Sequence, residues 1–180
     1  MRVVIVGTAG RKDDADLLNK SLYCRMVRDA LDKINDLDTD IDLVSGGAAW
    51  ADHIAVSLFL MNIPCIKSLT IYVPCSFNGE CFDNEVRDGG VANYYHRKFS
   101  DRLTGENHHT LAGIQRAIDR GATLITVDGG FFARNKLVAE SSEYLIAYTF
   151  NHGSIPKDGG TKHTWDLCKS KKIHVNLFNL

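Results

Sequence analysis

Short apolar runs rich in β-branched residues alternate along this chain with longer stretches of helical periodicity, and this alternation constrains the fold more than any other feature. The apolar runs predict strands at residues 1–6, 41–44, 65–73, 123–127, 144–150 and 173–178. The periodic stretches predict helices at residues 16–34, 48–60, 91–103, 107–120, 134–141 and 161–169. Strand and helix therefore follow one another as a repeated unit.

Repeated strand–helix units whose crossovers can return to the same sheet edge favour a mostly parallel sheet covered on both faces. We therefore predict a three-layer α/β/α, Rossmann-like fold. The 180 residues suit one domain spanning residues 1–180, because a core of this size needs no metal or disulfide to be stable. Apolar periodicity fades after the third strand, so residues 76–121 are interpreted as an inserted segment of loop and helix.

Charge and hydropathy exclude several classes of protein. Lys plus Arg number 21 and Asp plus Glu number 22, so the net charge of -1 offers no basic face for nucleic acid, which is not an expected partner. The longest apolar stretch, residues 55–66, is broken by Asn62 and Pro64 and is shorter than the roughly 20 residues that cross a bilayer. Five cysteines without a CxxC pair fit reduced thiols. We expect a cytoplasmic protein without a membrane partner.

Four predicted strands run into polar segments that contain glycine, at residues 7–11, 45–47, 128–130 and 158–161. Glycine lets the main chain approach a ligand, and the N–H groups at the start of a following helix attract an anion such as phosphate. In a parallel sheet these segments lie at one edge, where ligands of open α/β folds bind. The alternative is that each is an ordinary tight turn, for which glycine is also common.

Two arginines and one aspartate stand close to these turns. Arg11 and Arg134 each follow a glycine-bearing turn, where a guanidinium can bind a phosphate in bidentate fashion, and Asp52 lies in the helix after residues 45–47. The chain has no GxGxxG and no GxxxxGK[ST] motif, which disfavours a dinucleotide dehydrogenase and a P-loop NTPase. No histidine or cysteine spacing predicts a metal site, and no cofactor is expected.

Taken together, residues 6–11 (VGTAGR), 43–52 (LVSGGAAWAD), 133–136 (ARNK) and 144–148 (YLIAY), followed by Gly159-Gly160-Thr161, resemble the SLOG superfamily and its YspA-like branch. The resemblance covers the chain except for the inserted segment. It implies a Rossmann-like fold that binds a nucleotide or nucleotide-derived molecule at the glycine-rich strand ends, and a homodimer or larger homo-oligomer. The ligand-binding residues expected are Gly7, Thr8, Ala9, Arg11, Ser45, Gly46, Gly47, Asp52, Arg134, Asn135, Gly159, Gly160 and Thr161.

The resemblance leaves catalysis open. SLOG relatives include the LOG phosphoribohydrolases, which cleave the N-glycosidic bond of a nucleoside monophosphate, but the position of their catalytic glutamate is Thr164 in this chain. Hydrolysis of that bond needs a carboxylate, for which Glu140 and Asp52 are the candidates, with Asp83 and Glu85 as further ones if the inserted segment folds over the strand ends. The alternative is a module that senses or sequesters a nucleotide without turning it over.

The inserted segment also contains an aromatic and basic stripe, Tyr94, Tyr95, His96, Arg97 and Phe99. Aromatic rings and guanidinium planes stack well on nucleobases, so the stripe is a candidate for base binding. The competing interpretation is that it forms the buried face of an amphipathic helix.

Overall fold

The computed structural model describes residues 1–103 and 109–180, and its centre is a six-stranded sheet in which every neighbouring pair is parallel. The order across the sheet is β4-β3-β2-β1-β5-β6. The strands are β1 (Arg2–Gly7), β2 (Ile41–Ser45), β3 (Ile66–Val73), β4 (Thr123–Thr126), β5 (Tyr144–Thr149) and β6 (Lys171–Asn176).

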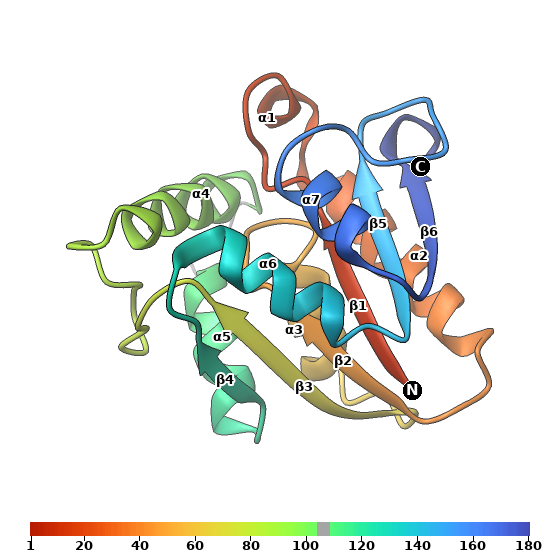
Figure 1. Ribbon diagram of the computed structural model, residues 1–180, viewed down its shortest axis with the longest axis horizontal. Helices are drawn as coiled ribbons and strands as arrows, with labels where there is room; N and C mark the ends of the chain where they lie inside the picture. Colours follow the sequence, from red (N-terminus) through yellow and green to blue (C-terminus); the bar gives the residue numbers. More distant parts are fainter. Residues whose placement is uncertain (104–108) are drawn as a thin grey trace.

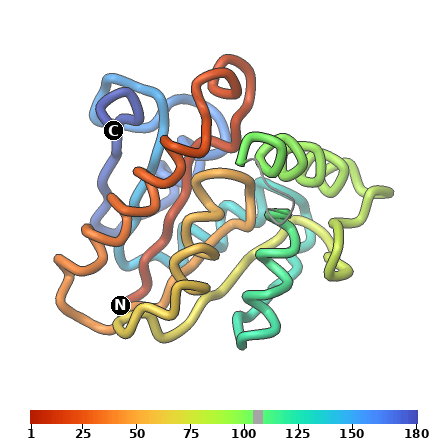
Figure 2. The backbone as a smooth tube through the Cα atoms, turned by 180° about the vertical axis from the view of Figure 1, so that it is seen from behind, coloured from red at the N-terminus to blue at the C-terminus, as the bar shows by residue number. Residues whose placement is uncertain are grey.

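Helices cover both faces of this sheet, as the predicted three-layer fold requires. The helices are α1 (Asp14–Leu17), α2 (Lys20–Asn35), α3 (His53–Leu60), α4 (Arg87–Leu103), α5 (Thr110–Asp119), α6 (Gly130–Glu140) and α7 (Gly160–Leu167), with a final 3-10 turn, η1 (Leu177–Asn179). Helices α6 and α7 lie in front of the sheet in Figure 1, and α2, α3 and α5 lie on the opposite face, which Figure 2 shows from behind. The Rossmann-like α/β/α prediction is confirmed.

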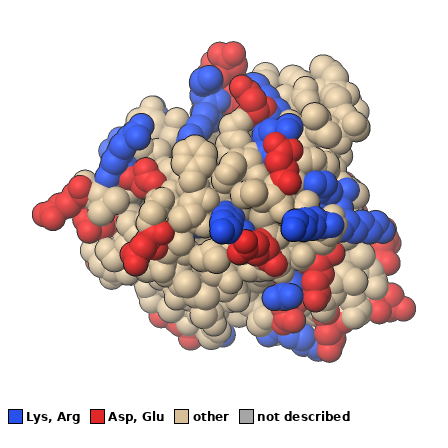
Figure 3. Space-filling model, in the orientation of Figure 1, with Lys and Arg blue, Asp and Glu red and all other residues tan. Residues whose placement is uncertain are grey.

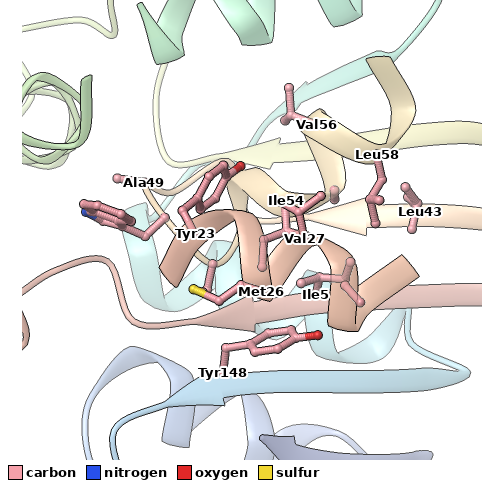
Figure 4. Close-up of a cluster of buried hydrophobic side chains, with 14 of the residues drawn as sticks. Ile5, Tyr23, Met26, Val27, Leu43, Ala49, Ile54, Val56, Leu58 and Tyr148 are labelled. Carbon is pink, nitrogen blue, oxygen red and sulfur yellow. The ribbon is translucent and has the colours of Figure 1, made fainter. Parts of the chain in front are cut away.

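The larger core lies between the sheet and the helices of the α2, α3 and α5 layer. Figure 4 shows Ile5 and Leu43 of the sheet facing Met26 of α2 and Ile54 of α3, and all four side chains are fully buried. Burial of a side chain of this size stabilises the folded state by roughly 1.5–3 kcal/mol. The opposite face has a smaller cluster, in which Val138 of α6 and Trp165 of α7 pack on the sheet.

The strand order places a topological switch point between β1 and β5. From β1 the chain adds β2, β3 and β4 in one direction, and it then returns to the other side of β1 to add β5 and β6. The connections after β1 and after β5 therefore diverge to opposite faces of the sheet and leave a crevice at the carboxyl ends of these two strands. The site described below lies there.

Two predicted helices differ from the structure, one because it is divided and the other because it begins later. Residues 16–34 form two helices, because Leu18 is extended and the Asn19 side chain accepts a hydrogen bond of 3.0 Å from the Leu22 N–H, which caps α2. Residues 48–52 are not helical, and Trp50 among them has a φ of 62°, so α3 begins only at His53. Both departures occur where the chain leaves the carboxyl edge of the sheet.

The inserted segment contains a loop, the long helix α4 and the helix α5. The α4 helix begins at Arg87 instead of residue 91, and the loop before it is closed by an isolated bridge between Phe77 and Phe82. Of the predicted helix at residues 107–120, positions 107 and 108 lie outside the described residues, and α5 starts at Thr110. Figures 1 and 2 both show α4 beside the carboxyl end of the sheet, close to α1.

Surface charge is mixed. On the face shown in Figure 3, basic and acidic side chains are interspersed, and neither sign forms a continuous patch. Within residues 1–103 and 109–180, no helix combines the length and the apolar character that crossing a bilayer requires.

Candidate functional site

A cavity of about 260 Å³ opens at the carboxyl ends of β1 and β5, at the switch point of the sheet. Its walls come from segments that are far apart in the sequence: the turn after β1, the turn after β2, helices α4 and α6, and the loop that leads into α7. Three of the four glycine-bearing segments thus meet at one place. The fourth, residues 128–130, begins α6, whose Phe131, Arg134 and Asn135 reach the cavity.

The structure brings together twelve of the residues expected to bind a ligand. Those that line the cavity are Gly7, Thr8, Ala9, Arg11, Gly46, Gly47, Asp52, Arg134, Asn135, Gly159, Gly160 and Thr161. Ser45 is fully buried behind the wall, where its hydroxyl donates to the Asp52 carbonyl at 2.8 Å and accepts from the Gly47 N–H at 3.0 Å. Ser45 therefore shapes the turn from behind.

Close packing explains the glycines at two of these positions. A Cβ on Gly7 would collide with the carbonyl oxygen of Tyr148 and with the Ala51 side chain. A Cβ on Gly46 would collide with the Arg134 guanidinium and the Asp52 carboxylate. At both positions the bare backbone is what lets β5 and the Arg134–Asp52 pair approach the turn.

Arg134 and Asp52 form a buried ion pair beneath the cavity, with 3.8 Å between Nη1 and Oδ2. Nη1 of Arg134 also donates to the Gly46 carbonyl oxygen. Burial raises the pKa of Asp52 above its usual range, while the Arg134 charge and backbone hydrogen bonds from Ala48, Gly7 and Gly46 oppose that shift. The pair fixes the turn after β2 to helix α6 and leaves a carboxyl group with a raised pKa in the cavity wall.

A second ion pair closes the opposite side of the cavity. The Thr8 hydroxyl donates to Asp14 at 2.7 Å and accepts from the Gly10 N–H at 3.1 Å. Lys157, from the loop after β5, donates to the other oxygen of Asp14 at 3.1 Å. This network joins the turn after β1 to a loop about 140 residues later in the chain.

The first turn of α7 faces the cavity. The Thr161 hydroxyl donates to the Gly7 carbonyl oxygen at 2.8 Å, and the Asn135 amide donates to the Gly160 carbonyl oxygen at 3.3 Å. These bonds hold the start of α7 between β1 and α6. The first N–H groups of a helix have no partner within it and carry the positive end of its dipole, so this wall can bind an anion.

Arg11 stands at the mouth of the cavity between two aromatic rings. Its guanidinium carbon is 5.3 Å from the ring centre of Tyr95 and 5.7 Å from that of Phe131. No carboxylate among the described residues forms an ion pair with Arg11. The guanidinium therefore packs on two aromatic rings, which leaves its N–H groups available to an anionic ligand.

Several cavity residues were not among those expected from the sequence, notably Lys12, Asp14, Thr149, Lys157 and Phe131. Lys157 stands two residues before the Gly159-Gly160 pair, so a search of the full loop for cations would have found it. Thr149 ends β5, and its hydroxyl is hydrogen-bonded to Nε2 of His174 at 2.8 Å. Asp14 carries no sequence signal of its own, because its role depends on Lys157.

Other proposed acids lie outside the cavity. Glu140 is at the end of α6, 56% exposed, and pairs with Lys136 at 3.9 Å. It follows Arg134 by six residues, so its side chain is rotated by about 240 degrees around the helix from that of Arg134. Asp83 and Glu85 lie in the loop before α4 and do not line the cavity. Of the candidate acids, the structure brings Asp52 alone to this wall among the described residues.

Among residues 1–103 and 109–180, no group of three or more histidine, cysteine, aspartate or glutamate side chains could hold a metal ion. His108 lies outside the described residues. His152 stacks on Phe178, and His163 packs against Phe132, both away from the cavity lining.

Fold and cavity define a Rossmann-like α/β protein with a cavity at the switch point of a parallel sheet. The chain belongs to the same family as the uncharacterized protein R261 of Acanthamoeba polyphaga mimivirus, with 39% identity over 184 residues that cover 98% of this chain and 96% of the viral protein. No family model matches the chain. No solved structure matches it either.

Proposed function

We propose that this protein binds a mononucleotide in the cavity at the carboxyl ends of β1 and β5, and that it is a member of the SLOG superfamily. The observation that carries the proposal is the convergence of three glycine-bearing turns and the start of α7 on one cavity at the switch point. Ligands of open α/β sheets bind at this point, and backbone N–H groups at a helix start suit a phosphate.

The charges around the cavity support an anionic ligand. Four cationic side chains line it, Arg11, Lys12, Arg134 and Lys157, against three carboxylates, Asp14, Asp52 and Asp158. Arg134 is paired with Asp52, and Lys157 with Asp14. Arg11 and Lys12 form no ion pair among the described residues, so their charges remain available in the cavity, and a phosphate bound there gains charge-assisted hydrogen bonds.

Hydrolysis of an N-glycosidic bond is the second candidate function, and Asp52 is the observation that favours it. A carboxyl group with a raised pKa in the cavity wall can donate a proton to a leaving base. Binding without turnover is the better supported version. Thr164 occupies the position of the glutamate of LOG enzymes, and its hydroxyl donates to the Gly160 carbonyl oxygen at 3.1 Å.

Isothermal titration calorimetry with the 5′-monophosphates of adenosine, guanosine, cytidine and uridine tests the proposal. At least one should bind, and Arg11→Ala should weaken that binding roughly 10- to 100-fold, as expected for loss of a hydrogen bond between charged groups. Lys67→Ala, on the opposite edge of the sheet, is the control and should bind normally. Absence of binding to all four nucleotides would refute the proposal.

Chromatography of the same mixtures separates the two versions of the function. If the wild-type protein releases free base and the Asp52→Asn variant does not, the protein hydrolyses the nucleotide through that carboxyl group. Binding without any released base would establish a sensing or sequestering module.

A further inference from the structure

Helix α4 forms one wall of the cavity, although it comes from the inserted segment that the SLOG resemblance does not cover. Val91, Ala92 and Tyr95 line the cavity from consecutive turns of this helix. Pro74, which follows β3, and Phe131 of α6 extend the same wall. This end of the cavity is apolar and aromatic apart from the Arg11 and Arg134 guanidiniums, which lie over the Phe131 ring, whereas the end formed by α7 and the glycine turns offers backbone N–H groups and Lys157.

Hydrogen bonds fix α4 in this place. Asp88, in its first turn, accepts a hydrogen bond of 2.8 Å from the Phe131 N–H at the start of α6. His96, 1% exposed, bonds through Nε2 to the Gly47 carbonyl oxygen and through Nδ1 to the Thr110 hydroxyl, both at 2.9 Å. A carbonyl oxygen only accepts, so Nε2 carries the proton and Nδ1 accepts from Thr110. The helix is therefore bonded to both α6 and the turn after β2.

Two adjacent tyrosines of α4 differ in a way that points to a ligand. Tyr94 is 45% exposed, does not line the cavity, and lies beside Arg97 and Lys98 on the outer surface. Tyr95 is half-buried, lines the cavity and carries the stacked Arg11 guanidinium. The aromatic and cationic planes of Tyr95 and Arg11 form the kind of surface on which a nucleobase stacks.

The size of the cavity limits what it can hold. A volume of about 260 Å³ is just below the range of small-molecule sites, which run from roughly 300 to 1,000 Å³, so only a small ligand fits. One mononucleotide suits this space, with its phosphate at the start of α7 and its base at the apolar end.

We infer that α4 is the base-recognition wall of this protein, with Tyr95 as the residue that stacks on the base, so that the ligand is a nucleotide with its base intact and not a sugar phosphate. This inference rests on the proposed function, because it assumes a phosphate bound at the start of α7. Beyond the proposed function, the inference states how the ligand is oriented in the cavity and which part of the chain recognises its base.

Calorimetric titration with two probes, adenosine 5′-monophosphate and ribose 5-phosphate, tests the inference. The wild-type protein should bind the nucleotide roughly 5- to 100-fold more tightly, the gain expected from stacking one base. Tyr95→Ala should abolish this preference, and because Tyr95 also packs on Arg11, the affinity for ribose 5-phosphate should fall by a smaller factor than that for the nucleotide. Tyr95→Phe should retain the preference, and Tyr94→Ala, the matched control on the outer face of α4, should behave as wild type.

The possible failures are distinguishable. If the wild-type protein binds both probes equally, or if Tyr95→Ala weakens both by the same factor, the inference is overturned while the proposed phosphate site stands. If neither probe binds, nor any of the other monophosphates, the proposed function fails and the inference with it. A thermal melt of each variant shows whether it is folded, and Tyr95→Leu, which keeps apolar bulk but lacks an aromatic face, replaces Tyr95→Ala if that variant unfolds.

Discussion

The two edges of the sheet use charged residues differently. At the amino edge, Lys67 pairs with Asp40 at 3.3 Å, with both side chains at least half exposed. At the carboxyl edge, Arg134 pairs with Asp52 with both side chains less than 10% exposed. An exposed pair contributes little to stability, whereas a buried one costs desolvation that close geometry must offset. The carboxyl edge therefore holds a buried ion pair in the wall of the cavity, and the amino edge holds an exposed one.

Breaking one ion pair at each edge should give the largest difference between them in the free energy of unfolding. Arg134→Leu leaves the Asp52 carboxylate buried without its partner and should lower the free energy of unfolding by about 3–5 kcal/mol. Lys67→Ala should lower it by less than about 0.5 kcal/mol. Urea denaturation of both variants measures this. The double variant Asp52→Asn, Arg134→Leu should recover part of the lost stability. Equal losses in Arg134→Leu and Lys67→Ala would contradict the distinction between a buried and an exposed ion pair.

Glycine substitutions extend the test to the backbone. Gly7→Ala places a methyl group against the Tyr148 carbonyl oxygen and should destabilise the protein by about 3 kcal/mol. The matched control is Gly90→Ala in α4, where a Cβ would meet nothing within 4 Å and should stabilise the helix by about 0.5–1 kcal/mol. Thermal melts of the two variants should move in opposite directions. A Gly7→Ala variant as stable as wild type would show that the turn after β1 has room for a side chain.

Acid should lower the stability of the folded protein through His96, which lies near the carboxyl edge of the sheet. Burial lowers the pKa of His96 to about 4, so between pH 4 and 6.5 the unfolded chain binds a proton that the folded protein does not. Stability is therefore lost as the pH falls, by about 2 kcal/mol between pH 7 and pH 5 from this residue. Burial also lowers the pKa of His53, whose ring centre is 5.9 Å from that of His96, so its contribution has the same sign.

Unfolding in urea at both pH values measures this effect in the wild type and in His96→Gln. The variant should lose about 2 kcal/mol less than the wild type on acidification, and His109→Gln, at an exposed position, should keep the full loss. An unchanged pH dependence in His96→Gln would show that His96 does not stay neutral in the folded protein.

The fold and the glycine-bearing side of the cavity could be predicted because both follow from local patterns. Alternating strand and helix signals favour a parallel sheet, and a parallel sheet places the turns after its strands at one edge. Gly7, Gly46 and Gly160 meet for that reason.

The remaining parts of the site depend on tertiary contacts that no local pattern encodes. The periodicity of α4 is that of any amphipathic helix, so it cannot reveal that Tyr95 faces a cavity while Tyr94 faces outward. The pairing of Asp14 with Lys157 joins residues 143 positions apart. Glu140 stands close to Arg134 in the sequence, but the helical rotation between them turns it away from the cavity.

A crystal structure of the protein soaked with adenosine 5′-monophosphate measures the central claim most directly. The phosphate should lie within hydrogen-bonding distance of the backbone N–H groups at the start of α7 and near Arg11, with the adenine ring against Tyr95. A nucleotide bound elsewhere on the molecule, or bound in the cavity with its base at the start of α7, would contradict the account.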